Sequence, residues 1–334
     1  MEALGRAPAP LEVPVPRRRP GEALVRIRAA ALNPVELHIC NGHFFDGPPR
    51  PPYVIGLEGA GVVEEGKRLA PGTRVRVEYV HPGYGRDGAV AEYALAPEEP
   101  DAADRASQAS LAPVSDSLSD TEVAALGVPV FTALMCLERA MVAGASLDGA
   151  HVLVTGATGA VGLVAVQLAK LMGAARVVAA GRNHERLERA LALGADAAVE
   201  LAPRLGADEL RDRFGEAAGG RLDVALDPLW GGTARAAIDA LTRDGVYVSF
   251  GQAASPVAEL SGIPMRNRRV TVVGHSGAWA TPQERQAALE RAFGLAGKRG
   301  RPLTLDAEEV ALEDIGDAWE RLSRSAGRRL VVRP

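Results

Sequence analysis

Cysteine is scarce in this sequence, because its 334 residues include only Cys40 and Cys136. A scaffold held by disulfide bonds needs more cysteines, and a structural zinc site of the cysteine-rich kind takes three or four thiolates. Both are therefore excluded. The 47% hydrophobic and 24% charged residues are instead typical of a globular protein with an apolar core.

Long apolar runs are also absent. The longest, near residues 160–169, contains Gln167 and is followed by Lys170, whereas a membrane-spanning helix needs about 20 apolar residues. The first 20 residues contain three consecutive arginines but no apolar core of a signal peptide. We therefore expect a cytoplasmic protein that does not interact with a membrane.

The sequence has no excess of positive charge. Lys and Arg number 38 and Asp and Glu number 42, which gives a net charge of -4. Proteins that bind nucleic acid through its phosphates are usually basic, so we expect no nucleic-acid partner. The length exceeds that of one compact core of average size and predicts two domains.

The first third of the chain is predicted to be rich in β-structure. Residues 23–28 alternate apolar and basic side chains after a Pro-Gly turn signal, and residues 58–63 and 73–77 are further short strands. Short strands at this spacing are typical of a partly open β-barrel. Residues 97–119, rich in Asp, Ala, Ser and Pro, are expected to form a surface loop that leads into the next domain.

From His151 onwards, strands alternate with helices. Apolar runs of strand length, as in a parallel sheet covered on both faces, lie at 151–155, 176–180, 197–200, 222–227 and 245–250. Helical patterns lie at 161–171, 185–193 and 233–241. This alternation predicts a doubly wound α/β domain. After about residue 262 the pattern is mixed, with strands at 269–273 and 329–332 and helices at 282–295 and 312–323.

A glycine-rich segment joins the first of these strands to the helix after it. Small residues allow the backbone to turn sharply and a diphosphate to approach the N–H groups at the helix N-terminus, where the helix dipole also favours an anion. A tight turn in any parallel sheet has a similar composition, but the flanking strands and helix favour a dinucleotide site. The predicted site consists of Thr155, Gly156, Ala157, Thr158, Gly159, Ala160, Val161 and Gly162.

The end of the second strand indicates which dinucleotide binds. A carboxylate about 20 residues after the turn would bind the ribose 2′-hydroxyl of NAD(H) and repel the 2′-phosphate of NADP(H). This sequence instead has Gly181, Arg182 and Asn183, with Arg186 one helical turn later. A guanidinium suits a phosphate, although both arginines could also be solvated residues at the start of a helix. We predict NADP(H) as the cofactor.

Segments along nearly the whole chain, taken together, resemble a known family. They include residues 31–36 (ALNPVE), residues 56–63 (GLEGAGVV), the glycine-rich turn and the closing residues 328–334. The chain is similar to the medium-chain dehydrogenase/reductase superfamily, and within it to zinc-independent quinone oxidoreductases. The resemblance implies a homodimer. It also implies a GroES-like barrel, a catalytic domain formed by residues 1–120 and 263–334, and a Rossmann domain at residues 121–262.

The zinc ligands of other members of the superfamily are missing. Zinc-bearing relatives have a cysteine near the position of Asn33 and a histidine at that of Leu57, and leucine cannot bind a metal. His38, Cys40 and His43 form a local H-x-C-x-x-H that could suit an open metal site, but no obvious fourth ligand accompanies them. We therefore predict no metal.

Without a metal, quinones and conjugated enones are the easier hydride acceptors. Their charge delocalises into an enolate or a hydroquinone anion, which hydrogen-bond donors can stabilise. We predict NADPH-dependent reduction of such a small molecule. The alternatives are an enoyl-thioester reductase or a reductase that tailors a secondary metabolite, and an NADPH-binding protein with a structural or regulatory role.

Four residues are candidate hydrogen-bond donors to the substrate: Asn33, His43, Tyr53 and Thr132. The resemblance places Asn33 and Thr132 near the nicotinamide, and an imidazole can act as an acid near neutral pH. The tyrosine that donates a proton in enoyl-thioester reductases aligns with about Phe44, which has no hydroxyl. Further cofactor-binding residues are expected where strands of the sheet end, at Asp227, Phe250, Gly251, Gly274 and His275.

Overall fold

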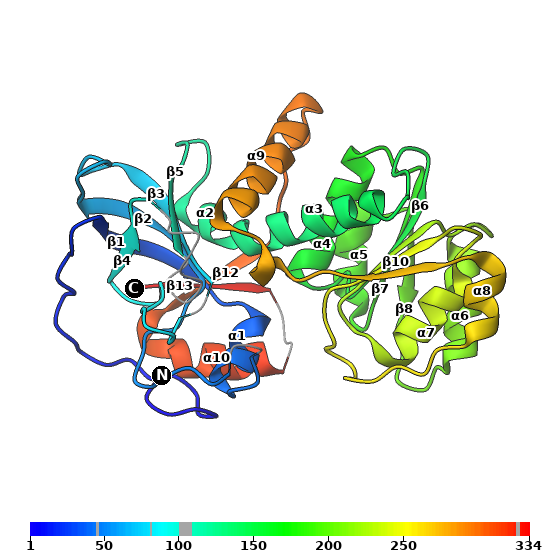
Figure 1. Ribbon diagram of the computed structural model, residues 1–334, viewed down its shortest axis with the longest axis horizontal. Helices are drawn as coiled ribbons and strands as arrows, with labels where there is room; N and C mark the ends of the chain where they lie inside the picture. The colour runs from blue at the N-terminus through cyan, green and yellow to red at the C-terminus, as the bar shows by residue number, and fades with distance from the viewer. Residues whose placement is uncertain (45–46, 81, 100–108, 325–327) are drawn as a thin grey trace. The chain divides into compact units, whose positions relative to one another are not determined.

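The computed structural model describes residues 1–44, 47–80, 82–99, 109–324 and 328–334. The chain forms two compact units (Figure 1). The first unit comprises Met1–Val128, Ala280–Gln286 and Leu305–Pro334, and the second comprises Pro129–Trp279 and Ala287–Thr304. Among the described residues, every helix is too short or too polar to span a lipid bilayer.

A mostly antiparallel sheet forms the first unit. Within the described residues it has seven strands in the order β12-β13-β1-β2-β3-β5, with β4 paired to β1. The strands are β1 (Glu22–Ala31), β2 (Glu58–Glu65), β3 (Arg74–Tyr79), β4 (Tyr93–Pro97), β5 (Ala109–Pro113), β12 (Ala307–Ala311) and β13 (Arg329–Arg333). The helices of this unit are α1 (Pro34–Cys40), α2 (Asp120–Ala125), the 3-10 turn η3 (Leu312–Asp314) and α10 (Ile315–Ser323).

Alternation along β1 separates the core from the solvent. Val25 and Ile27 are buried in one cluster with Val75 and Val77 of β3, whereas Arg26 between them is exposed. Trp319 of α10 belongs to the same cluster. The predicted strands at 23–28, 58–63 and 73–77 are therefore confirmed, with ends that extend further by a few residues.

The segment 97–119 is not only a surface loop, as the sequence predicted. Residues Ala109–Pro113 form β5, which pairs antiparallel with β3 from Val75↔Pro113 to Tyr79↔Ala109. Residues 100–108 of the expected loop lie outside the described residues. The sequence missed β5 because ASLAP has no β-branched or aromatic residue, so pairing with β3 rather than propensity determines its conformation.

A parallel sheet forms the centre of the second unit. Its strands, within the described residues, run in the order β11-β10-β9-β6-β7-β8. They are β6 (His151–Thr155), β7 (Arg176–Gly181), β8 (Ala197–Glu200), β9 (Val224–Asp227), β10 (Val246–Ser249) and β11 (Thr271–Gly274). The helices are α4 (Ala160–Leu171), α5 (His184–Ala192), α6 (Ala207–Ala217), α7 (Gly231–Ala240) and α8 (Gly262–Arg268), with the 3-10 turn η2 (Gly277–Trp279). Most of α3 (Gly127–Val142) and of α9 (Pro282–Lys298) also belongs to this unit, although the first residues of each belong to the first unit.

This strand order confirms the Rossmann fold. Read from β6 as the first strand, the order is 3-2-1-4-5-6, the order of dinucleotide-binding sheets. Figure 1 shows α4 on one side of the sheet and α6 and α7 on the other, where Phe214 and Ile238 pack on Leu153 and Tyr247. The order reverses between β6 and β9, and ligands of such sheets bind outside the carboxyl ends of the strands at that point.

Candidate functional site

The glycine-rich turn lies between the end of β6 at Thr155 and the start of α4 at Ala160. Gly156 has a φ of 58°, and a Cβ there would lie 2.7 Å from Pro228, so this position requires glycine. Gly162 also requires glycine, since its Cβ would lie 2.4 Å from the carbonyl oxygen of Gly156. These two glycines let α4 approach the turn closely.

Gly159 differs from these two glycines. It is the N-cap of α4 with a φ of -90°, and no side chain caps the helix there. A Cβ on Gly159 would meet only the carbonyl oxygen of Gly156, at 3.3 Å, so the space outside the turn is open. A 12-residue helix thus begins without a side-chain acceptor for its first N–H groups, which suits an anion.

Arg182 lies at the end of the neighbouring strand β7. The residue is exposed, and its guanidinium makes no ion pair or hydrogen bond with the described part of the chain. Gly181 is buried, and a Cβ there would lie 2.4 Å from the Thr158 side chain of the turn. We call residues 156–162 together with Arg182 the anion cradle.

Asn183 acts first as a helix cap. Its Oδ1 accepts a hydrogen bond from the backbone N–H of Arg186 at 2.9 Å, which begins α5. The side-chain oxygen of Asn183, a predicted cofactor-binding residue, is therefore already occupied within the protein. Arg186 itself is half-buried in the first turn of the same helix.

The carboxylate of Asp227, a predicted cofactor-binding residue, is already bonded within the protein. The carboxylate is buried and accepts hydrogen bonds from the hydroxyls of Thr155 and Tyr247. It also accepts from the backbone N–H groups of Leu229 at 3.0 Å and Trp230 at 2.9 Å. Four protein donors satisfy both oxygens, so the Asp227 carboxylate and the Thr155 hydroxyl stabilise the end of the sheet.

The backbone conformation of Trp230 depends on its hydrogen bond to the Asp227 carboxylate. It has a φ of 61°, which is rare for a residue with a bulky side chain, and the hydrogen bond to Asp227 holds its backbone there. Its ring lies 6.0 Å from that of Tyr247, between centroids, and packs on the core of the second unit. Burial and the neighbouring Asp227 charge raise the pKa of Tyr247, so its hydroxyl stays protonated and donates to Asp227.

The remaining cofactor candidates follow β10 and β11. Gly251 requires glycine because its Cβ would lie 2.7 Å from the carbonyl oxygen of Pro228, and Phe250 beside it is half-buried. A Cβ on Gly274 would meet no atom within 4 Å. The backbone N–H of His275 donates to the carbonyl oxygen of Ser249 at 2.8 Å, which continues the β10–β11 pairing.

Thr132 lies on α3 near the loop that follows His275. A Cβ built on Gly277 would lie 3.0 Å from the Phe131 ring and 3.8 Å from the Thr132 hydroxyl oxygen. The structure thus brings Thr132 close to the segment after β11. Its hydroxyl makes no hydrogen bond with the residues that the structure describes.

Asn33, in the first unit, is a predicted hydrogen-bond donor to the substrate whose amide already has partners within the protein. It is buried, and its Nδ2 donates to the carbonyl oxygen of Ala31 at 3.3 Å and to Oε1 of Glu58 at 3.2 Å. Both neighbours are acceptors, so the amide cannot be flipped without losing these bonds. Its two N–H bonds are therefore used within the protein.

Glu58 and Glu36 are the residues that the sequence analysis missed around Asn33. Glu58 is buried, pairs with Arg329, and accepts from the backbone N–H of Val128 at 2.6 Å. Glu36 accepts from the backbone N–H groups of Asn33 and Gly56, each at 2.7 Å. Burial raises the pKa of Glu36 to about 7 despite these two hydrogen bonds. The sign in the sequence that could have identified Glu58 was a charged residue at the start of the otherwise apolar strand 58–63.

Tyr53 and His43 have different surroundings. The Tyr53 hydroxyl is 3.1 Å from the Cys40 thiol, and burial raises the pKa of both groups, that of Cys40 to about 12. The hydroxyl of Tyr53, a predicted substrate donor, is therefore buried and already has a partner within the first unit. His43 is exposed, as is His38, whereas Cys40 is buried. Among the described residues, no three His, Cys, Asp or Glu side chains are grouped so that they could hold a metal.

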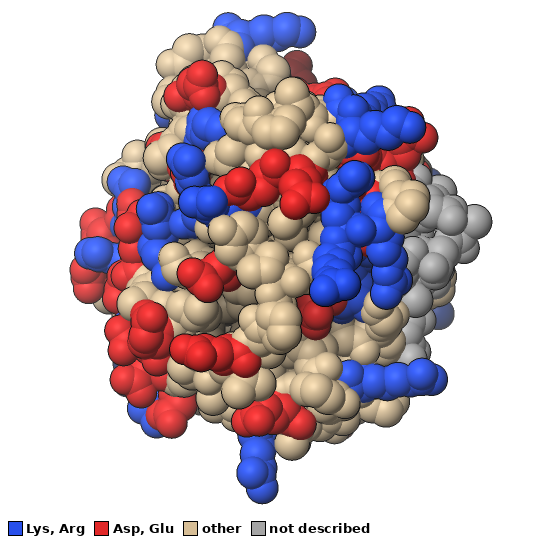
Figure 2. Space-filling view, turned by 90° about the vertical axis from the view of Figure 1, so that its left-hand side faces the viewer, with Lys and Arg blue, Asp and Glu red and all other residues tan. Residues whose placement is uncertain are grey.

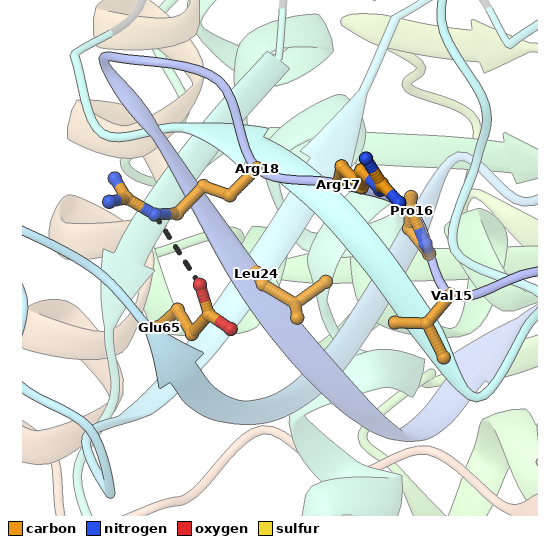
Figure 3. Close-up of a pocket in the computed structure, with 6 residues that line it drawn as sticks. All are labelled: Val15, Pro16, Arg17, Arg18, Leu24 and Glu65. Atoms are coloured by element: carbon orange, nitrogen blue, oxygen red, sulfur yellow. Dashed lines mark ion pairs between the residues drawn. The ribbon is translucent and has the colours of Figure 1, made fainter.

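A surface hollow of the first unit contains none of these candidates. It is lined by Val15, Pro16, Arg17, Arg18, Leu24 and Glu65 (Figure 3). Arg18 is paired with Glu65 at 3.7 Å, so part of its charge is compensated. Figure 2 shows side chains of both signs across the face that it presents, and that face offers no surface of a single sign to a polyanion.

Two family models match the sequence. The Alcohol dehydrogenase GroES-like domain matches residues 19–102, and the Zinc-binding dehydrogenase model matches residues 160–293. The first of these falls in the first unit and supports the predicted GroES-like barrel. The second covers the Rossmann sheet from α4 onwards.

Relatives extend the match over nearly the whole chain. A zinc-type alcohol dehydrogenase-like protein of Schizosaccharomyces pombe is 37% identical over 173 residues, which are 51% of this chain and 48% of that protein. The quinone oxidoreductase of Lama guanicoe is 28% identical over 323 residues, which cover 94% of this chain and 88% of its own. A solved quinone oxidoreductase of Thermus thermophilus, also determined with NADPH, is 28% identical, covers 100% of both chains and has a TM-score of 0.75. The chain therefore belongs to the medium-chain dehydrogenase/reductase superfamily of oxidoreductases, in its quinone-oxidoreductase-like branch.

Proposed function

We propose that this protein is an NADPH-dependent oxidoreductase that reduces a quinone or a conjugated enone by hydride transfer without a metal ion. The observation that carries the proposal is the anion cradle: an uncapped helix N-terminus with open space at Gly159, together with the guanidinium of Arg182, which has no partner among the described residues. The helix N-terminus suits a diphosphate and the guanidinium suits a 2′-phosphate. The NADPH complex of the Thermus relative supports the same cofactor.

A zinc ion, which the name of one matching family model implies, does not fit the residues present. Leu57 is a buried apolar side chain, and the Asn33 amide is already bonded to Glu58 and Ala31. Glu58 is paired with the buried Arg329. These positions therefore supply no set of three ligands, and we derive no step through a metal.

In the proposed reaction, the protein binds the cofactor, stabilises negative charge on the substrate and delivers a proton. NADPH supplies the hydride when it is bound. The anion cradle holds the cofactor, and the residues around the substrate stabilise negative charge and deliver a proton. Among the four candidate donors, Asn33 and Tyr53 are occupied within the protein, so we assign these tasks to Thr132 and His43. We further propose that the enzyme acts on a small molecule in the cytoplasm as a homodimer.

The test is to mix the full-length protein with NADPH or NADH and a panel of quinones and conjugated enones, and to follow the loss of cofactor absorbance. We expect faster oxidation of NADPH than of NADH, unchanged by a metal chelator. A requirement for stoichiometric zinc would contradict the metal-free reaction. Binding of NADPH without oxidation by any acceptor would favour a structural or regulatory role instead.

A further inference from the structure

Trp279 is the most exposed of the three tryptophans in this chain. Its exposed fraction is 67%, whereas Trp319 is 7% exposed in the core of the first unit and Trp230 is half-buried. An exposed apolar residue is common on a protein surface, so exposure alone assigns no role. The position of Trp279 in the fold and the chemistry of its ring decide what it can do.

Trp279 follows the carboxyl end of the parallel sheet. β11 ends at Gly274, and the 3-10 turn η2 after it ends at Trp279. The backbone N–H of Trp279 donates to the carbonyl oxygen of Ser276 at 3.2 Å, which closes this turn. Ligands of doubly wound sheets bind outside the carboxyl ends of the strands. The exposed indole therefore comes directly after the edge of the sheet at which a ligand is expected.

The turn that carries Trp279 packs on α3, within the second unit. A Cβ built on Gly277 would lie 3.0 Å from the Phe131 ring and 3.8 Å from the Thr132 hydroxyl oxygen. Phe131 is buried and supports the turn, whereas Thr132 is half-buried and is one of the two residues to which we assign contact with the substrate. Trp279 comes two residues after Gly277, which is about 4 Å further along a 3-10 turn. A flat substrate that bonds to Thr132 is therefore within reach of the indole.

The indole ring suits a planar, electron-poor partner. Its face attracts positive charge more strongly than that of the other aromatic side chains, and aromatic rings pair in offset-stacked arrangements. The two carbonyl groups of a quinone withdraw charge from its ring, and a fused-ring quinone covers most of an indole. A small aliphatic enone has neither an aromatic ring nor this area. The indole can therefore distinguish two classes of acceptor that the proposed function leaves together.

We propose that Trp279 determines substrate specificity: its indole stacks on the ring of a fused-ring aromatic quinone and holds that ring beside the Thr132 hydroxyl. The inference rests on the proposed hydride transfer from NADPH and narrows its acceptors to one class. Trp279 neither supplies nor removes a proton, so its contact with the substrate is the same before and during the chemical step. Such a contact lowers KM and leaves kcat almost unchanged.

The experiment follows two acceptors, naphthoquinone and cyclohexenone, with the full-length protein and NADPH. Trp279→Ala removes the ring, and Trp279→Phe keeps an aromatic ring that can stack. Val142→Ala is the matched control, because it truncates a side chain that is 78% exposed at the end of α3, in the same unit. Steady-state kinetics give kcat and KM for each acceptor. With NADP⁺ in place of NADPH no turnover occurs, and quenching of tryptophan fluorescence then measures the binding of naphthoquinone directly.

We expect Trp279→Ala to raise the KM for naphthoquinone about three- to tenfold, as for the loss of one aromatic pair, with little change in kcat. The ratio of the kcat/KM values for naphthoquinone and cyclohexenone should fall by the same factor. Trp279→Phe should recover most of this ratio, whereas Val142→Ala should behave as the wild type does. Naphthoquinone should quench the fluorescence of the wild type much more than that of Trp279→Phe, in which the stacked indole is absent.

Three results would overturn the inference while leaving the proposed cofactor in place. They are an unchanged KM for naphthoquinone in Trp279→Ala, an equal loss of kcat/KM for both acceptors, and wild-type turnover of cyclohexenone but not of naphthoquinone. An equal loss together with a changed sedimentation coefficient of Trp279→Ala would show that the indole packs against a second copy of the chain instead. If the wild-type protein oxidises NADPH with no acceptor, the proposed function and this inference fail together.

Discussion

The Glu58 carboxylate and the Arg329 guanidinium form a buried ion pair between residues 271 positions apart in the sequence. Arg329 also donates to the carbonyl oxygen of Leu32 at 2.5 Å, and Asn33 Nδ2 donates to the same carboxylate oxygen as Arg329. The pair therefore connects β2, β13 and the start of α1 in the first unit. Glu78, directly opposite Glu58 in the β2–β3 register, has arginine partners of its own, including Arg76 at 2.6 Å.

Removing one member of this pair should destabilise the protein strongly. We expect Arg329→Met to lower the free energy of unfolding by about 3–5 kcal/mol, because the Glu58 charge is left buried and uncompensated. Denaturant unfolding measures the loss. The double variant Glu58→Gln/Arg329→Met should recover much of it, since neither charge remains. If Arg329→Met alone lowers the free energy of unfolding by less than about 1 kcal/mol, the buried ion pair is contradicted.

Glu36 should make stability depend on pH. Burial raises the pKa of its carboxyl group from 4.5 to about 7, so between these values the folded protein binds a proton that the unfolded chain has released. The free energy of unfolding therefore falls as pH rises through this window, by up to about 1.4 kcal/mol per pH unit from this group. Unfolding measured at several pH values tests the slope.

The control for this prediction is Glu36→Gln, which cannot ionise. Glu36 accepts hydrogen bonds from the backbone N–H groups of Asn33 and Gly56, and in the variant one of these groups faces the N–H of the glutamine amide. The variant should therefore be less stable than the wild type at low pH. Its deficit relative to the wild type should shrink as pH rises. A deficit that stays constant from pH 4.5 to 7 would show that Glu36 does not titrate in this range.

The local patterns of the sequence predicted most elements, whereas the partners of the polar side chains could not be read from them. The apolar run at 151–155 and the helix after it became β6 and α4 almost unchanged, because burial on both faces of a parallel sheet leaves a clear pattern. The strand β5 was missed because its pairing with β3, and not its composition, determines it.

The roles of individual site residues depended on contacts that are distant in the sequence. Asn33 was predicted to be a donor, but its partner Glu58 lies 25 residues away. Asp227 was predicted to bind the cofactor, but Thr155, 72 residues earlier, and Tyr247 occupy it. Residue type and spacing suggested which polar residues matter, and only the folded chain shows which of their atoms are already bonded.

Gly159 permits a test of the anion cradle that does not disturb the fold. Valine at this position needs a shift of only a few tenths of an ångström, because its Cβ would meet the Gly156 carbonyl oxygen at 3.3 Å and the backbone φ of -90° suits any residue. We expect Gly159→Val to melt close to the wild type but to lose NADPH binding, since its side chain fills the space of the diphosphate. Calorimetry and thermal unfolding together check this.

The matched variant is Gly162→Ala in the same turn. Its Cβ would lie 2.4 Å from the Gly156 carbonyl oxygen and 2.6 Å from Cα of Ala157, so the backbone must move and stability should fall. The two variants thus separate a loss of binding from a loss of structure. Wild-type affinity for NADPH in a folded Gly159→Val protein would place the diphosphate elsewhere.

Arg182 should determine the preference for NADPH over NADH. Its guanidinium has no partner among the described residues, so replacing it leaves no protein group unpaired and the effect falls on the ligand. We expect Arg182→Asp to weaken NADPH binding by about 1–3 kcal/mol, because an attraction to the 2′-phosphate becomes a repulsion, and to spare NADH. Arg243→Asp makes the same change of charge at an exposed position before β10. Arg243 therefore lies near the amino ends of the parallel strands, whereas Arg182 lies at their carboxyl ends. Arg243→Asp should leave both affinities unchanged, so an equal effect of the two substitutions would show that net charge, and not a contact with Arg182, selects the cofactor.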